Sequence, residues 1–536
     1  MKITRPANLF LAFLSGIFLS IAWPQNGFAP LLFIAWIPLL IVEDYFYVNR
    51  NEVKAKKLFG LSYLSFLVWN ILTTWWVWNA TDVGSIAAFA CNSLFMALVF
   101  TMFHFTRCKA GNVTGYISLP VYWIAFEYIH LQWELSWPWL TLGNGFASSY
   151  KWIQWYEYTG VLGGSLWILM VNILLFKIIF LQKPQTSPSS GGIKPQTIIT
   201  ALIIVLPVIY SLIRYNKYKE TSHPVNISIV QPNIDPYNEK FSGMNARDQL
   251  LKLLRLASTV TDSLTDYLAA PETALPNGIW EEDLQNHPDI KLLRSFMKAF
   301  PNLTVVIGAA TNRMYEEGKP HSETARKFTD SPAYYDSYNT ALQLDNFTGS
   351  IQAYHKSKLV PGVEKMPYPK IFGFLEKLSI NLGGMSGSLG AEKEPFDFIS
   401  NDSIKIAPII CYESVYGDYI AKYVRKGAHF LFIITNDGWW GNTPGHRQHL
   451  EYGRLRAIEM RRSIARSANT GISCFINQRG DISHATKYWE DDAIKETLNA
   501  NNEITFYAKH GDDFFKKFCW ASLLLLTYTV YKKFRK

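Results

Sequence analysis

Long apolar runs alternate with short polar segments over the first 214 residues, and a longer segment of mixed character follows them. A helix of about 17 or more apolar residues can cross the roughly 30 Å of hydrocarbon in a bilayer. Eight such runs lie near residues 8–23, 27–43, 58–78, 86–106, 116–132, 160–181, 197–214 and 515–531. The pattern predicts a membrane domain with seven spans at residues 1–214, a polar domain at 215–513, and a last span with a basic tail at 514–536.

Within the polar domain, short β-rich runs alternate with amphipathic stretches, which favours an α/β fold with a layered sheet. The expected strands are 227–231, 267–270, 303–308, 340–344, 350–354, 404–410, 429–434, 472–476 and 503–507. The expected helices include 245–264, 289–299 and 446–467.

Composition agrees with a membrane protein that carries a polar domain. The 536 residues are 49% hydrophobic, 15% aromatic and only 18% charged, which is too apolar for an ordinary soluble chain. Lys2 and Arg5 precede the first run as they would in a secretory signal, but Ile21-Ala-Trp-Pro offers no small-x-small cleavage site and a second run follows directly. We therefore expect the first run to remain as a span.

Loop charges predict the orientation, because Lys and Arg of short loops stay on the cytoplasmic side. Positive residues concentrate in alternate segments: Lys2 and Arg5; Arg50, Lys54, Lys56 and Lys57; Arg107 and Lys109; Lys183 and Lys194. Both termini are then cytoplasmic, and residues 215–513 lie outside the membrane. Much of the net charge of +9 lies in these loops and the tail, so anionic lipid is a simpler partner than nucleic acid.

Three residues that follow predicted strands carry candidate chemistry: Glu272, Lys356 and Cys411. A thiolate is a strong nucleophile, a carboxylate can take its proton, and an ammonium can stabilise an oxyanion. Taken singly, each residue also has a structural explanation, as a first-turn glutamate of a helix, a solvated lysine and a small buried cysteine.

The segments around these residues together resemble the nitrilase, or carbon–nitrogen hydrolase, superfamily, and within it the apolipoprotein N-acyltransferase family. The matching segments are Pro271-Glu-Thr-Ala, Tyr354-His-Lys-Ser-Lys-Leu-Val-Pro, Ile410-Cys-Tyr-Glu, Thr435-Asn-Asp-Gly-Trp-Trp-Gly, Arg456-Ala-Ile-Glu and Ala468-Asn-Thr-Gly. The order of seven spans, polar domain and last span is similar too. The resemblance implies an αββα sandwich for the polar domain.

The resemblance also implies roles for the site residues. Glu272 would be the general base, Lys356 the stabiliser of the oxyanion and Cys411 the nucleophile, with support from Glu364, Tyr412 and Glu413. Two segments depart from the family pattern. The chain reads Leu359-Val-Pro-Gly-Val-Glu where the family usually has an aromatic residue after the proline, and Phe241 stands near the position where members often carry a lipid-contacting Trp.

The implied reaction moves an acyl chain from a membrane phospholipid, through a Cys411 thioester, to the amino-terminal diacylglyceryl-cysteine of an apolipoprotein at the periplasmic face of a bacterial inner membrane. It needs no cofactor. Cys411 must then stay reduced and not pair with Cys474, and the His446 and His449 pair is expected to start a polar helix and not to bind a metal.

Two other classes remain open on the sequence: a membrane-tethered amidase or hydrolase with the same three residues, and a non-enzymatic transporter or scaffold. The complete Glu, Lys and Cys set and the scarcity of charge within the spans disfavour the latter. Aromatic residues gather in the segments 133–139, 152–158 and 439–440. They are expected to act either as ordinary interfacial anchors or as a lipid-facing gate.

Overall fold

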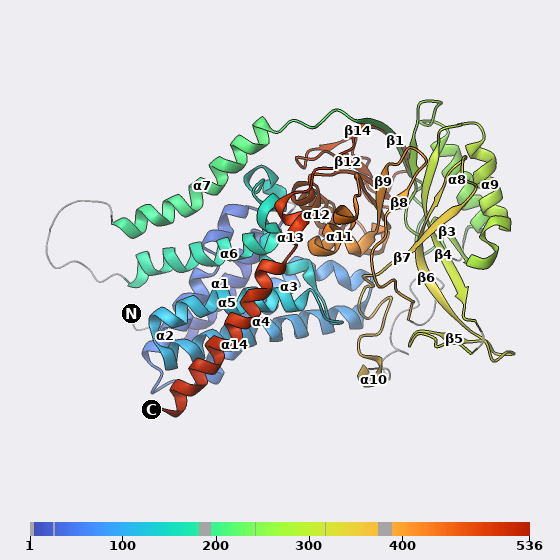
Figure 1. The fold of residues 1–536 in the computed structure, drawn as a ribbon. Helices are drawn as coiled ribbons and strands as arrows, with labels where there is room; N and C mark the ends of the chain where they lie inside the picture. Colours follow the sequence, from blue (N-terminus) through green and yellow to red (C-terminus); the bar gives the residue numbers. More distant parts are fainter. Residues whose placement is uncertain are drawn as a thin grey trace. The chain divides into compact units, whose positions relative to one another are not determined.

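The computed structural model describes residues 5–24, 27–181, 194–241, 243–316, 318–372 and 388–535. The chain forms two compact units, which Figure 1 shows as helices in one part and sheets in the other. The helical unit comprises Met1–Trp75, Ser85–Lys217 and His510–Lys536. The α/β unit comprises Tyr218–Lys509 together with the short segment Trp76–Gly84.

Every run that the sequence predicts to span the membrane overlaps a helix of the helical unit. Its helices are α1 (Arg5–Ile21), α2 (Ile37–Val48), α3 (Ala55–Thr74), α4 (Asp82–Ala110), α5 (Asn112–His130), α6 (Tyr156–Phe176), α7 (Pro195–Lys217) and α14 (Asp513–Phe534). Among the described residues, five helical stretches are long and apolar enough to cross a membrane: Ala29–Val48, Ala55–Asn79, Asp82–Ala110, Tyr156–Leu181 and Pro195–Lys217. Helix α1 is apolar but shorter, and α5 and α14, with 19 and 22 residues, are long enough but more polar. The prediction of several spans is confirmed, and eight is an approximate count.

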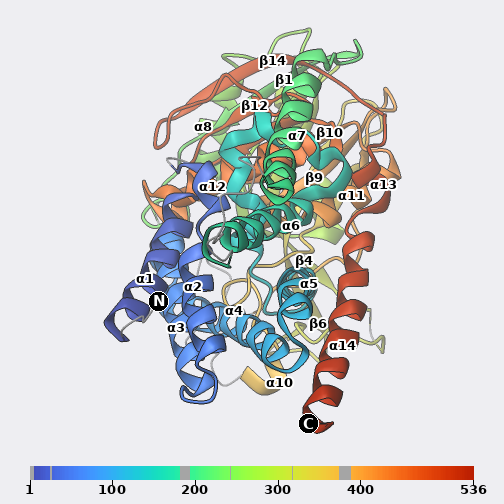
Figure 2. The ribbon, with the colours of Figure 1, turned by 90° about the vertical axis from the view of Figure 1, so that its left-hand side faces the viewer.

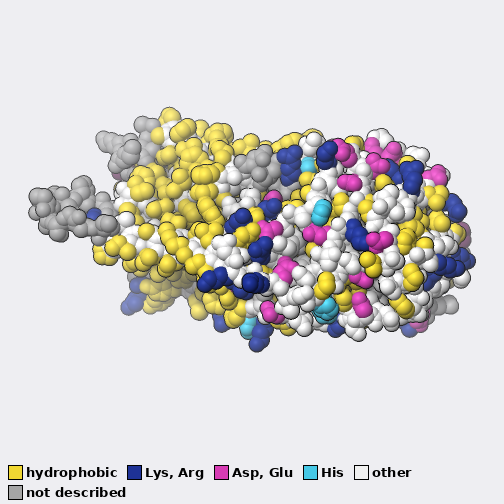
Figure 3. Space-filling model, turned by 90° about the horizontal axis from the view of Figure 1, so that it is seen from above, with side chains coloured by type: hydrophobic (Ala, Val, Ile, Leu, Met, Phe, Trp, Pro, Cys, Tyr) yellow, Lys and Arg dark blue, Asp and Glu magenta, His cyan; other side chains and the backbone are white. Residues whose placement is uncertain are grey.

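Within this unit, α1 packs against α3, and α14 runs along α5 (Figure 2). A cluster of ionised groups joins α2 to α4. His104 Nδ1 lies 2.7 Å from Glu43 Oε1, and Arg107 contacts both Glu43 and Asp44. Buried charges need such pairing. By contrast, Figure 3 shows hydrophobic side chains over most of the visible surface of the helical unit, and Lys, Arg, Asp and Glu scattered over the α/β unit. This contrast is what a lipid-facing and a water-facing part require.

In the part of the α/β unit that the structure describes, the strands form two sheets. The first has eight strands in the order β14-β1-β2-β4-β6-β5, with β3 on β4 and β7 on β6. The second has six in the order β13-β12-β11-β10-β9-β8. The strands of the first sheet are β1 (Pro224–Gln231), β2 (Tyr267–Ala269), β3 (Leu275–Trp280), β4 (Thr304–Met314), β5 (Arg326–Lys327), β6 (Tyr334–Leu344), β7 (Ile351–His355) and β14 (Asp492–Asn499). Those of the second are β8 (Phe398–Ile399), β9 (Lys405–Ile410), β10 (Phe430–Thr435), β11 (Ser463–Ala468), β12 (Cys474–Ile476) and β13 (Ile482–Ser483).

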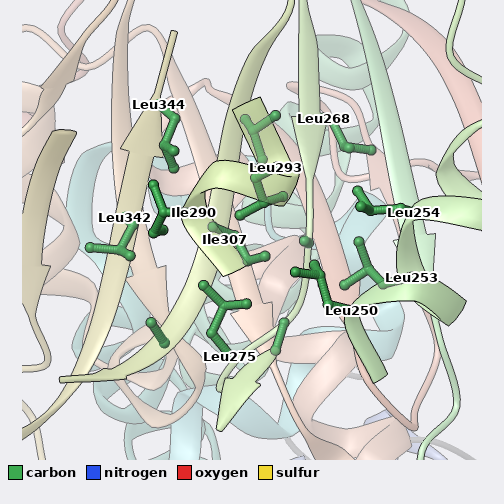
Figure 4. Packing of buried hydrophobic residues seen from close by; sticks show 14 of the residues in the cluster. Leu250, Leu253, Leu254, Leu268, Leu275, Ile290, Leu293, Ile307, Leu342 and Leu344 are labelled. Carbon is green, nitrogen blue, oxygen red and sulfur yellow. The ribbon is translucent and has the colours of Figure 1, made fainter. Parts of the chain in front are cut away.

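The two sheets face each other, and helices cover their outer faces. Tyr267 of β2 packs edge-on against Phe432 of β10, and the Ser467 hydroxyl of β11 donates to the carbonyl of Val230 in β1. Helices α8 (Ala246–Ala257) and α9 (Pro288–Met297) cover the first sheet with leucine and isoleucine side chains (Figure 4). The second sheet carries α11 (Gly417–Lys426) and α12 (Pro444–Met460). The unit is therefore an αββα sandwich, as predicted; α10 (Pro369–Phe372) and α13 (Phe506–His510) are short additions.

Three predicted elements differ from the structure. The helix expected at 446–467 ends at Met460, because Arg461 adopts a left-handed φ of 48° and the chain enters β11. The helix expected at 245–264 ends at Ala257. The strand expected at 503–507 is wrong, since α13 begins at Phe506, and the strand that completes the first sheet is β14.

Candidate active site

Three strand ends meet between the two sheets and bring the predicted chemical groups together. Glu272 follows β2, Lys356 follows β7 directly, and Cys411 follows β9 directly. Lys356 Nζ lies 3.2 Å from Glu272 Oε1. The charges of both residues act on the Cys411 thiol, so the three groups share one electrostatic environment. Side chains at strand ends leave the packed sheet on a fixed backbone, which suits them to hold reacting groups.

The backbone is strained at two of these three turns. Cys411 and Thr273, the residue after Glu272, both have a φ of 51°, a left-handed conformation that side chains other than glycine rarely adopt. Such conformations persist only where surrounding contacts enforce them, and they cluster at functional sites. Gly308 of β4 supports the Glu272 turn from behind, where a Cβ atom would stand 2.5 Å from the Thr273 amide nitrogen.

Lys356 is held between two carboxylates. Its ammonium donates to Glu272 Oε1 and, at 2.9 Å, to Glu364 Oε1, while only 1% of the residue is exposed. Asn339 of β6 ties the same carboxylates together, since its Nδ2 donates to Glu272 at 2.7 Å and to Glu364 at 3.1 Å. Burial alone would lower the pKa of Lys356, but the negative charges of Glu272 and Glu364 hold it well above its usual range. The two carboxylates therefore favour the charged form of Lys356.

Cys411 rests as a protonated thiol. It is partly exposed, and no disulfide joins it to Cys474, because both are free cysteines. Burial of the sulfur and the charge of Glu272 raise the pKa of the thiol, and the charge of Lys356 only partly offsets this. The thiol therefore needs a base to remove its proton, and the nearby carboxylate of Glu272 suits that role.

Glu413 joins the lysine turn to the cysteine turn. Its Oε1 accepts from the Tyr354 hydroxyl at 2.6 Å and from the Ser357 amide at 2.7 Å, and its Oε2 accepts from the Ile410 amide at 2.8 Å. Burial raises the pKa of Glu413 to about 7, although these hydrogen bonds lower it. Tyr412 is buried and packs edge-on against Tyr416. The structure thus places both residues in the buried surroundings of the cysteine turn.

Sequence comparisons match most of the chain to one family. The family model described as "Apolipoprotein N-acyltransferase N-terminal domain" matches residues 15–174, and the model described as "Carbon-nitrogen hydrolase" matches residues 226–504. A protein of Chlorobaculum tepidum called apolipoprotein N-acyltransferase is 32% identical over 94% of this chain and 93% of its own length. The chain belongs to the apolipoprotein N-acyltransferase family.

A second relative with the same name, from Geobacter metallireducens, is 27% identical over 96% of this chain and 93% of its own length. Among solved structures, an amidase of Nesterenkonia sp. shares 13% identity, with a TM-score of 0.36 over 55% of this chain and 95% of that one. The family-level match over both halves of the chain makes it an acyltransferase of the carbon–nitrogen hydrolase superfamily and a membrane protein.

An aromatic cluster lies beside the candidate active site. Phe241 stacks on Trp439 with ring centroids 6.1 Å apart, and Tyr237 packs edge-on against the same indole. Trp440 packs against Trp76, which belongs to the segment Trp76–Gly84 of the α/β unit. Phe241 therefore has an aromatic partner in this chain.

The other two aromatic segments, 133–139 and 152–158, lie in the helical unit. Their residues differ in solvent exposure. Trp139 is 1% exposed and Tyr156 is fully buried, so both belong to the interior of this unit. Tyr158 is 45% exposed and remains suited to a lipid or interfacial contact. The prediction of interfacial aromatics thus applies to single residues of these segments and not to each segment as a whole.

Four buried polar residues at the site were not identified from the sequence. These are Asn339, Lys240, Asp437 and Arg466. The ammonium of Lys240 donates to the carbonyl of Glu272 at 2.9 Å, and burial lowers the pKa of Lys240 to about 8, which the charge of Glu272 partly offsets. Arg466 Nη2 donates to Asp437 Oδ2 at 2.6 Å. Asp437 stands in the Thr435–Gly441 motif, so a role could have been sought there, whereas Lys240 and Asn339 give no such signal.

Proposed function

We propose that this protein is an apolipoprotein N-acyltransferase that moves a fatty acyl chain from a membrane phospholipid to the α-amino group of an S-diacylglyceryl-cysteine at the amino terminus of a lipoprotein. The observation that carries the proposal is the grouping of Glu272, Lys356 and Cys411 in the sandwich of a chain that also has a membrane domain. Both substrates are anchored in lipid, which explains why a nitrilase-type unit is attached to apolar helices.

The first half of the reaction acylates the enzyme. Glu272 takes the proton of the Cys411 thiol as the sulfur attacks the ester carbonyl of the phospholipid. The ammonium of Lys356 stabilises the oxyanion that forms on the carbonyl oxygen. When the intermediate collapses, the carbon–oxygen bond breaks, Glu272 returns the proton to the departing alkoxide, and a lysophospholipid leaves. The acyl chain remains on Cys411 as a thioester.

The second half transfers the acyl chain to the acceptor. The neutral α-amine attacks the thioester carbonyl, Lys356 again faces the oxyanion, and Glu272 accepts a proton from the attacking nitrogen. Breakage of the carbon–sulfur bond releases Cys411, which recovers its proton from Glu272, and the lipoprotein leaves with an amide. Glu364 and Asn339 keep Lys356 and Glu272 in register through both halves, and Glu413 and Tyr412 support the turn that bears the sulfur.

The place of the reaction follows from the loop charges. We propose that the helical unit and α14 lie in a bacterial inner membrane, with both chain ends cytoplasmic and the domain at residues 215–513 on the periplasmic side. The aromatic cluster of Tyr237, Phe241, Trp439, Trp440 and Trp76 would contact the acyl chain, because large aromatic surfaces pack well on hydrocarbon.

Intact mass spectrometry tests the proposal. The purified protein and its Cys411→Ala variant are incubated with phospholipid and no acceptor. We expect the parent to gain one fatty-acyl mass that hydroxylamine removes, and to lose it to a diacylglyceryl-cysteine peptide, while the variant stays unmodified. Release of free fatty acid without amide formation would favour the hydrolase alternative. A parent that neither gains the mass nor produces lysophospholipid would contradict the acyltransferase and leave the amidase and the non-enzymatic alternatives to be tested.

A further inference from the structure

The turn that bears the nucleophile is held from behind by side chains of α12. Cys411 begins a short 3-10 helix, Cys411–Val415, with its own φ in the left-handed region. The carbonyl of Cys411 accepts from the Ser414 hydroxyl at 2.8 Å. Arg456 Nη1 of α12 donates to the carbonyl of Val415 at 2.7 Å. The strained turn therefore depends on groups outside itself.

His449 stands at the centre of these contacts. Its Nε2 lies 2.8 Å from Ser414 Oγ and 3.2 Å from the carbonyl oxygen of Cys411. Its Nδ1 lies 3.0 Å from Asp437 Oδ1, and only 1% of the residue is exposed. A carboxylate can only accept a hydrogen bond, so Nδ1 carries a proton toward Asp437 and the opposite nitrogen faces the cysteine turn. The imidazole thus links a carboxylate of one loop to the backbone of the nucleophile.

Asp437 is itself fixed, so the ring that it holds cannot turn freely. Arg466 Nη2 of β11 donates to Asp437 Oδ2 at 2.6 Å, and the Thr435 hydroxyl donates to Asp437 Oδ1 at 2.9 Å. Burial alone would raise the pKa of Asp437, but the positive charge of Arg466 holds it well below its usual range. The charged form of Asp437 is therefore favoured, and this carboxylate orients the His449 ring. Carboxylates orient histidine side chains in the same way in metal sites.

The same histidine touches the aromatic cluster beside the site. The indole of Trp440 packs edge-on against the imidazole with ring centroids 5.6 Å apart. Trp440 in turn packs on Trp76 at 4.8 Å, and Asn79 Nδ2 donates to its carbonyl at 2.8 Å. The rings of Trp440 and His449 therefore link a residue of the Trp76–Gly84 segment to the nucleophile turn.

We propose that His449 is a positioning residue of the acyl transfer, which fixes the Cys411 turn on the Asp437–Arg466 ion pair and links it to the aromatic cluster. The residue does not touch the reacting atoms. Through the Ser414 hydroxyl, which contacts both its Nε2 and the carbonyl of Cys411, it keeps the turn in place, so that the sulfur stays aligned with Glu272 and Lys356. This inference rests on the proposed function, but it also predicts a property of the thiol that needs no lipid.

The test compares His449→Leu, His449→Gln and a matched control, His446→Leu. His446 is equally buried on α12 one turn earlier, where it stacks on Tyr488 instead of the cysteine turn. Two quantities are measured for each variant: the rate at which iodoacetamide alkylates Cys411, followed by peptide mass spectrometry, and kcat and KM of acyl transfer. Thermal midpoints report the folded state of each variant.

We expect His449→Leu to lower both the alkylation rate and kcat by about 10- to 100-fold, with KM within about twofold, because a small misplacement of the nucleophile costs rate and not binding. His449→Gln, whose side-chain amide can still hydrogen-bond to Ser414, should recover part of the loss, and His446→Leu should keep the parent values. Equal losses in His449→Leu and His446→Leu would overturn the inference, as would unchanged alkylation in His449→Leu. If the parent is alkylated but transfers no acyl chain, the proposed function fails while the alkylation series still decides the role of His449.

Discussion

Lys240 places a second ammonium group next to the base of the site. It is 2% exposed, its ammonium donates a hydrogen bond to the carbonyl of Glu272, and burial lowers its pKa to about 8 from an ordinary value of 10.5. A lowered pKa means that the folded state disfavours the charged form. The parent protein therefore loses stability as the pH falls from about 10.5 through 8, and carries the full loss below that window.

We predict that Lys240→Met stabilises the protein near pH 7 and that this gain disappears toward pH 10.5. Removal of the buried charge should raise the free energy of unfolding by about 3 kcal/mol. Loss of the hydrogen bond to the carbonyl of Glu272 should lower it by about 1 kcal/mol. Acyl transfer should nevertheless slow, because the turn that bears Glu272 loses a contact. The measurement is the difference in thermal midpoint between variant and parent at pH 7 and at pH 10.

Lys252→Met is the matched control for this change. Lys252 also donates to a backbone carbonyl, that of Asn233 at 3.3 Å, but it is partly exposed on α8. Its replacement should shift the midpoint little at either pH. A difference between Lys240→Met and the parent that is the same at pH 7 and pH 10 would contradict a buried charge at position 240.

Strand β4 sets the position of the base turn through a close backbone approach. The amide of Gly308 donates to the carbonyl of Pro271 at 3.1 Å, and a Cβ atom at 308 would lie 2.6 Å from the Cα atom of Glu272. The atoms in the way belong to the backbone, so no side-chain rotation can relieve the clash. The strand can accept only glycine here without moving the base.

We predict that Gly308→Ala destabilises the protein by about 1–3 kcal/mol, as overpacking of a core does, and lowers kcat more than it changes KM. Gly453→Ala is the control, because a Cβ there would meet only the methyl ends of Ile476 and Ile433, at 3.1 and 3.9 Å. Its effect on stability and activity should be small. A Gly308→Ala enzyme with the kcat of the parent would show that the Glu272 turn does not depend on this contact.

Apolar runs made the inner strands predictable, but not the strands that depend on tertiary partners. Strands β9 and β10, with the sequences Lys405-Ile-Ala-Pro-Ile-Ile and Phe430-Leu-Phe-Ile-Ile-Thr, are both read correctly from their hydrophobic residues. Strand β11 has the sequence Ser463-Ile-Ala-Arg-Ser-Ala and is fully buried, because the charge of Arg466 is paired with Asp437. Edge strand β14 is mostly polar. Neither shows the alternation of a half-buried strand.

The site residues also divide into those that a local sequence motif identifies and those that only the folded structure brings to the site. Glu272, Lys356, Glu364, Cys411 and Glu413 stand in short motifs, so their residues could be named from the sequence. The contacts of Asn339 with two carboxylates, and of Lys240 with one carbonyl, join segments more than 20 residues apart. Such contacts leave no local pattern, and they require the sheet register, such as the pairing of Asn339 with Ala310.

At the scale of the whole chain, the loop charges predict on which side of the membrane each segment lies. The fold of each unit does not determine this. Positive residues at Arg50, Lys54, Lys56 and Lys57 should keep the loop before α3 in the cytoplasm, whereas the α/β unit should lie outside. Lys516 and Lys517 lie at the outer end of α14 in this arrangement, where they would reach toward headgroups along the surface.

Single cysteines introduced at exposed positions test this topology without changing the positive charges that direct it. Glu52→Cys reports the loop before α3, and Asp491→Cys reports the α/β unit; both positions are exposed. Each is placed in a chain whose five native cysteines are replaced by alanine. In intact spheroplasts, a membrane-impermeant maleimide should label position 491 and not position 52, and detergent should make both react. Labelling of position 52 in intact spheroplasts, with position 491 protected until lysis, would reverse the orientation and place the reaction on the cytoplasmic side.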